Sequence, residues 1–107
     1  MSGGRYHYAY QHIGTLADDL EAELGRTPAE PPPDARVWSR ERRGWIEGEE
    51  AAAVLRAVDA ERAWLVRVLR AVGKAAHDVE WVDSGDYGPG DEVEAIRAVR
   101  ALLERAP

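Results

Sequence analysis

The sequence predicts an all-α protein: a small helical bundle built around one long central helix. Apolar residues recur at spacings of three and four in three separate segments. No proline occurs from 48 to 79, whereas four prolines fall within 28–33 and exclude helix and strand there. The length fits one domain, 1–107, with a flexible N-terminus at 1–5 and a Pro-rich connector at 26–37.

Composition narrows the chemistry that the protein can perform. The chain has no cysteine, which excludes disulfides, zinc–thiolate sites and thiol nucleophiles. A net charge of −6 argues against bulk nucleic-acid binding by the whole surface. There is no apolar run of about 18 residues and no apolar signal segment, so we expect a cytoplasmic protein without membrane contact.

The first helix is expected from about Tyr6 to Leu24, where apolar residues mark one face. Gly25 follows as the residue expected to end it. Gly14 lies inside the helix and is expected where a neighbouring helix packs closely.

The long helix is expected from Gly48 to Val79 and carries two apolar stripes. At 1.5 Å per residue it is about 45 Å long, whereas a compact domain of this size has a radius of gyration near 13 Å. Either the helix bends near Gly73, or a second copy covers the overhang. We therefore predict a dimer or a higher even oligomer with Trp64 near the interface. The two stripes are Leu55, Val58, Leu65, Leu69, Val72, Ala76 and Val79, and Ala53, Ala57, Ala60, Trp64, Val68 and Ala71.

The last helix is expected in the segment GDEVEAIRAVRALLER, with acidic residues at its N-terminal end and arginines further on. Its predicted core face consists of Val93, Ile96, Val99 and Leu103.

Arginines alternate with tryptophans in the segment RVWSRERRGW, in which Ser39 is a candidate cap for a short helical turn. Arginine forks match phosphates and indole faces stack on bases, so this segment is the first candidate ligand site. The alternative is that the two tryptophans anchor a loop in the core. A second polar aromatic patch is expected on the outer face of the first helix. The predicted ligand-binding residues are Arg36, Trp38, Arg40, Arg42, Arg43 and Trp45, with Tyr8 and His12 from the second patch.

The stretch from 77 to 94 holds seven carboxylates and no Lys or Arg. One interpretation is a capping loop before the last helix, ordered by its glycines. A second is a metal site formed by Asp83, Asp86 and Asp91. A third is an interface onto which the arginine–tryptophan segment docks, from the same or another subunit.

Two pairs of acids, Glu47-x-x-Glu50 and Glu80-x-x-Asp83, resemble the Mg²⁺-binding pairs of the all-helical MazG family. That resemblance implies a nucleotide pyrophosphohydrolase, in which these four carboxylates hold Mg²⁺. No other cofactor or metal is expected.

The motif EWVDSGD followed by a short helix, in a short cysteine-free helical chain, looks like small accessory proteins of phages and mobile elements. Proteins of that type include anti-defence inhibitors, among them oligomeric sponges that sequester signalling nucleotides. With no catalytic nucleophile in evidence, we expect a non-enzymatic homo-oligomer that captures a small anionic ligand or a partner protein. The alternatives are the Mg²⁺-dependent hydrolase and a protein–protein adaptor.

Overall fold

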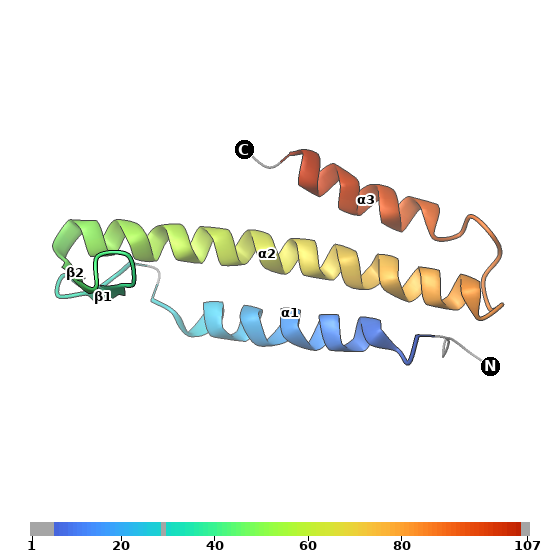
Figure 1. Cartoon of the computed structure of the whole chain (residues 1–107), viewed down its shortest axis with the longest axis horizontal. Coiled ribbons are helices and arrows are strands. Elements are labelled where there is room, and N and C mark those ends of the chain that lie inside the picture. The colour runs from blue at the N-terminus through green and yellow to red at the C-terminus, as the bar shows by residue number, and fades with distance from the viewer. Residues whose placement is uncertain (1–5, 29, 106–107) are drawn as a thin grey trace.

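The computed structural model describes residues 6–28 and 30–105, which form three α-helices and one two-stranded hairpin (Figure 1). The chain is mostly helical, as predicted, but the antiparallel hairpin was not expected. The predicted flexible N-terminus, 1–5, lies outside the described residues. The elements are α1 (Ala9–Arg26), β1 (Arg36–Ser39), β2 (Gly44–Glu47), α2 (Gly48–Asp83) and α3 (Val93–Glu104).

Helix α2 is the central element, and both other helices pack against it. It begins at Gly48, as predicted, and continues without a break through Gly73 to Asp83. Helices α1 and α3 lie on opposite sides of it and run antiparallel to it (Figure 1). Both contact α2, and over the described residues they do not contact each other. The helices of one chain therefore do not close into a bundle.

Helix α1 starts and ends later than its apolar pattern predicts. It begins at Ala9 because His7 and Tyr8 both adopt the left-handed conformation, with φ of 58° and 56°. Gly25 lies inside the helix and does not end it. The helix ends before Thr27, which is extended because Pro28 follows it.

The close approach of α1 to α2 occurs at a glycine of α2. A Cβ atom built on Gly73 would lie 3.5 Å from Cγ2 of Ile13, which is ordinary van der Waals contact. Gly14 has no such neighbour within 4 Å. The expected packing role of Gly14 is therefore wrong, and Gly73 takes it.

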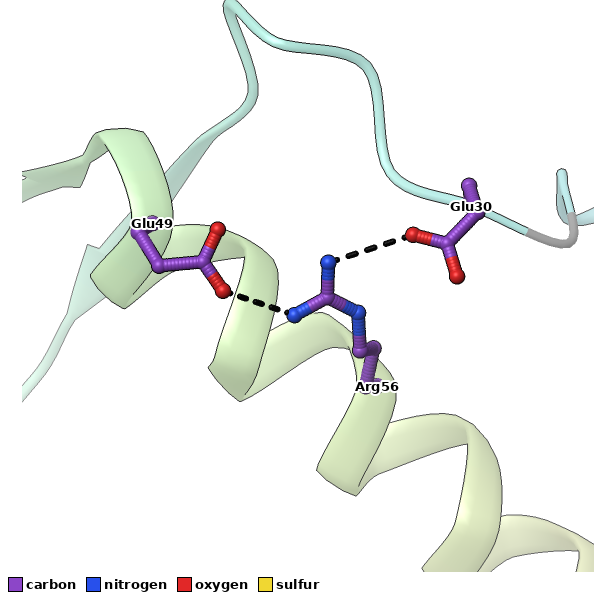
Figure 2. Close-up of polar contacts among 3 residues, drawn as sticks. All are labelled: Glu30, Glu49 and Arg56. Atoms are coloured by element: carbon purple, nitrogen blue, oxygen red, sulfur yellow. Dashed lines mark hydrogen bonds and ion pairs between the residues drawn. The ribbon is translucent and has the colours of Figure 1, made fainter.

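An ion-pair bridge joins the connector to α2 (Figure 2). Arg56 donates to Glu49, seven residues earlier in α2, at 2.8 Å, and to Glu30 in the connector at 3.1 Å. Further along the connector, Ala35 is buried and its N–H donates to the carbonyl oxygen of Pro32. These contacts bring β1 alongside the first turns of α2.

The core is small and made mostly of alanine. Its buried apolar residues are Ala17, Ala35, Ala51, Ala52, Val66 and Ala95. The predicted core face of the last helix is wrong in three of its four positions, because the residue that α3 buries is Ala95, while Val99 is half-buried and the other three are exposed. Val93, Ile96 and Leu103 are exposed, Leu103 at 52 %.

The molecule is elongated for its size. It extends over 55 × 26 × 25 Å, and its radius of gyration is 18.5 Å, against about 13 Å for a compact domain of this length. Its accessible surface is 7763 Å², against about 5,900 Å² for a compact monomer of this mass. Large apolar residues such as Leu16, Leu65 and Leu103 are among those left exposed.

We predict that substituting leucine at the two glycines of the α1–α2 pair has unequal effects. Gly73→Leu should lower the free energy of unfolding by about 1–3 kcal/mol, because the added side chain meets Ile13 across the contact. Gly14→Leu should be neutral or stabilising by up to about 1 kcal/mol, since it improves helix propensity and meets no neighbour. Urea unfolding followed by circular dichroism measures both. Equal losses in the two variants would contradict the assignment of the contact to Gly73.

Candidate binding site: an arginine–tryptophan hairpin

The hairpin holds the predicted arginine–tryptophan cluster at one end of the molecule, beside the first turns of α2 (Figure 1). Its strands pair antiparallel, with Trp38 opposite Trp45 and Arg36 opposite Glu47. Since side chains alternate between the two faces of a strand, these four share the outer face. The exposure of the strands alternates in the same way.

The two tryptophans form an exposed pair. Their ring centroids are 5.6 Å apart with the planes at 77°, an edge-to-face arrangement. Each side chain is 57 % exposed. The guanidinium carbon of Arg36 lies 4.5 Å from the ring centroid of Trp45. The alternative that Trp38 and Trp45 anchor a loop in the core is therefore wrong.

The arginines of the hairpin divide into two kinds. Arg36 is held by the carboxylate of the last β2 residue at 3.2 Å, and Arg42 by a carboxylate in the first turn of α2 at 2.6 Å. Arg40 and Arg43 have no ion-pair partner in the part of the chain that the structure describes. Two guanidinium groups thus remain available for an anion beside the tryptophan pair.

The turn of the hairpin is ordered by a left-handed residue and a side-chain hydrogen bond. Residues 40–43 connect the strands, and Arg43 takes a positive φ of 51° before Gly44. The hydroxyl of Ser39 accepts a hydrogen bond from the N–H of Arg42 at 3.1 Å. Ser39 therefore caps a turn, as expected, but the turn joins two strands and does not begin a helix.

Tyr8 precedes α1 and His12 lies in its first turn, and this end of α1 lies beside the far end of α2 from the hairpin (Figure 1). The N–H of Tyr8 donates to the carboxylate of Glu80, at 2.7 and 3.1 Å to its two oxygens. Since an α-helix rises 1.5 Å per residue, about 45 Å of α2 separates this end from the hairpin. One chain therefore does not bring Tyr8 and His12 to the arginine–tryptophan site.

The four carboxylates of the MazG-like pattern also lie in two pairs at opposite ends of α2. Glu47 and Glu50 adjoin the hairpin, and Glu80 and Asp83 end α2. Glu80 is 1 % exposed, and its carboxylate accepts a hydrogen bond from the N–H of Tyr8. Asp83 accepts a hydrogen bond from the hydroxyl of Tyr6. A magnesium ion shared by all four would need carboxylates from two chains.

The acidic stretch is part helix and part loop. Asp78, Glu80 and Asp83 belong to α2, and Asp91 accepts a hydrogen bond from the N–H of Gly88 at 2.6 Å in the loop before α3. Across 6–28 and 30–105, no group of three or more His, Asp or Glu side chains is arranged to hold a metal ion. Asp83, Asp86 and Asp91 therefore do not form the metal site considered from the sequence.

An aromatic cluster around His77 was missed by the sequence analysis. The His77 ring stacks on Trp81 at 5.2 Å and meets the rings of Tyr10 and Tyr87 edge-on at 4.8 and 6.0 Å. The i,i+4 spacing of His77 and Trp81 on α2 is a signal that could have identified one side of it. Tyr10 and Tyr87 come from α1 and from the loop, so this cluster joins three segments of the chain.

Beside this cluster, Asp78 is buried and paired. It is 4 % exposed and lies 2.8 Å from Nζ of Lys74 and 2.9 Å from Nδ1 of His77. Burial acts to raise the pKa of Asp78, but the hydrogen bonds and charges of Lys74 and His77 together hold that pKa below its ordinary value of 3.8. The hydrogen bond to Asp78 in turn raises the pKa of Lys74. Both groups are charged at neutral pH.

Comparison with known proteins does not add a function. No protein-family model, no curated protein and no solved structure matches the chain. Within the described residues, none of the helices has the length and apolar character needed to cross a membrane.

We predict that Asp78→Asn destabilises the protein at neutral pH and that the loss disappears in acid. A carboxylate whose folded pKa is depressed contributes stability above its unfolded pKa, and this contribution is lost as pH falls through the folded pKa. The variant should lose roughly 1–3 kcal/mol at pH 7. The difference should shrink below about pH 4.

Urea titrations of wild type and variant across this pH range provide the test. Asp19→Asn, at an exposed position of α1, is the matched control and should show no such pH-dependent difference. A loss for Asp78→Asn that stays constant into strong acid would contradict the charged pair.

Proposed function

We propose that this chain is a non-enzymatic binding protein that works as a homo-oligomer and captures a small anionic ligand on its arginine–tryptophan hairpin. The observation that carries the proposal is the pair of tryptophans, each 57 % exposed, which lie beside Arg36 on one face of a two-stranded sheet whose turn carries three further arginines. Large aromatic side chains are usually mostly buried, so an exposed pair in contact with an arginine is unusual.

A nucleotide has the chemistry that this surface would recognise. Every base offers a flat face that stacks on an indole, and a phosphate accepts two hydrogen bonds from one guanidinium fork. Trp38 and Trp45 would take the base, and Arg40 and Arg43 would take the phosphate. Such a protein would act as a sponge in the cytoplasm, in the manner of phage-type anti-defence proteins that sequester signalling nucleotides.

The elongated shape supports the homo-oligomer. The chain exposes about 1,900 Å² more surface than a compact monomer of its mass. Trp64, half-buried in the middle of α2, is proposed to lie near the contact between copies.

We predict that calorimetry against a panel of cyclic and linear nucleotides detects binding, and that the hairpin is responsible for it. Trp38→Ala should weaken binding about 10-fold or more, since stacking on one base contributes roughly 1–3 kcal/mol. The substitution should leave the helical circular dichroism signal unchanged, because the side chain is mostly exposed.

Arg40→Ala should weaken the same binding, and its dependence on salt should decrease. Arg62→Ala is the matched control, an exposed arginine of α2 outside the hairpin, and should bind like wild type. No heat with any nucleotide would overturn ligand capture and favour a protein partner for the hairpin.

A further inference from the structure

An apolar groove runs between α1 and α3, with α2 as its floor. Its volume is 580 Å³. Tyr6 and Ala9 line the α1 wall, Val72 and Val79 the floor, and Ile96 and Leu103 the α3 wall. It exists because α1 and α3 contact α2 from opposite sides without touching each other in the described part of the chain.

The floor of this groove continues along α2 past the end of α3. Residues 7, 14 and 18 positions apart share a helix face, which puts Leu65, Val58 and Val54 in line with Val72. Leu65 is 39 % exposed and Val54 37 %. The first half of α2 therefore carries a partly exposed apolar stripe, in which Val58 is half-buried, and the second half forms the floor of an open apolar groove.

We infer that the first half of α2 from a second copy of this chain occupies the groove, with the two α2 helices antiparallel. This arrangement is isologous, because each chain supplies one stripe and one groove. It places Val54 of one chain opposite Val79 of the other, and Leu65 opposite Val68, on either side of the two-fold axis. At each end of the dimer, α1, α3 and the second half of α2 then surround one helix of the partner. The helical bundle predicted from the sequence is thereby closed by two chains.

The surface that the elongated shape leaves exposed exceeds what one face of a stable dimer buries. A standard interface buries about 800 Å² per partner. The excess surface of the chain is about twice that. Aliphatic side chains such as Val72, Val79 and Ile96 make up most of the groove lining, and burying them on a partner is favourable.

Charges on the two surfaces are complementary. Glu61 is the acidic residue within the stripe, and Arg100 lies on the α3 wall of the groove. Neither has an ion-pair partner within 6–28 and 30–105. The antiparallel register brings Glu61 of one chain to the level of Val72 of the other, within the part of the groove that Arg100 lines. The same packing sets the arginines of each hairpin beside the acidic end of the partner's α2.

This inference rests on the proposed function and completes its site. The hairpin and α1 lie on the same side of α2 (Figure 1), so an antiparallel second copy places its hairpin beside the first turn of α1. Tyr8 and His12, which one chain holds about 45 Å from its own hairpin, then adjoin the partner's Trp38 and Trp45. The two predicted halves of the ligand site meet across the dimer.

Cysteine cross-linking tests the register directly, because the natural chain has no cysteine. The double variant Val54→Cys/Val79→Cys should form a covalent dimer on oxidation. Each single variant should remain a monomer in denaturing gels, because two-fold-related copies of one residue lie about 37 Å apart in this register. Under reducing conditions, the double variant should sediment as a dimer. Leu65→Glu should reduce the sedimenting mass to that of one chain, while helical content is retained.

Cross-linking of Val54→Cys alone would overturn the antiparallel arrangement in favour of a parallel one. A wild-type monomer at micromolar concentration, or a dimer whose double variant does not cross-link, would also overturn it. Nucleotide binding is measured separately by calorimetry. Cross-linking without a measurable heat of nucleotide binding would overturn only the proposed ligand capture. A heat of nucleotide binding without cross-linking would overturn only the occupancy of the groove.

Discussion

The length of α2 is the constraint on which the rest of the structure depends. It has 36 residues, whereas α1 has 18 and α3 has 12. Because both shorter helices contact only α2 among the described helices and strands, they cover two sides of it over part of its length. The remaining apolar surface forms the groove and the stripe. The elongated shape and the small alanine core follow from this mismatch.

A second constraint acts at the end of α2, where two carboxylates are taken out of water. Glu80 is compensated by the N–H of Tyr8, and Asp78 by Lys74 and His77. These are structural roles, since each carboxylate is occupied by a group of its own chain. The Glu80 contact also holds Tyr8 in its left-handed conformation and so sets where α1 begins.

The sequence was sufficient to predict elements whose signals are local. The start of α2 at Gly48 and the apolar periodicity of all three helices follow from residue spacing alone. The boundaries of α1 differ from the predicted ones because the two interactions that fix its ends involve residues outside its apolar pattern. At one end, a carboxylate 72 residues away binds the Tyr8 amide; at the other, Pro28 extends Thr27.

The hairpin was not predicted because each strand has only four residues, too few for alternation to be recognised. Its turn also places Arg43, not glycine, at a positive φ. The residues of the candidate site were identified from their chemistry, but their arrangement was not. Spacing along the chain does not reveal that one long helix separates Tyr8 and His12 from the arginines and tryptophans.

That separation also keeps the basic and acidic segments of the chain at opposite ends of the molecule. The basic hairpin and the acidic stretch cannot neutralise each other within one chain, since α2 holds them apart as a rigid spacer. In the proposed antiparallel dimer, this separation would be removed at both ends at once, by the same packing that would fill the groove. Burial of the apolar face and pairing of opposite charges therefore favour the same assembly. Since a parallel pair would set like charges side by side, the charge pattern would select the direction of packing in the proposed dimer, and the apolar stripe would supply most of its free energy.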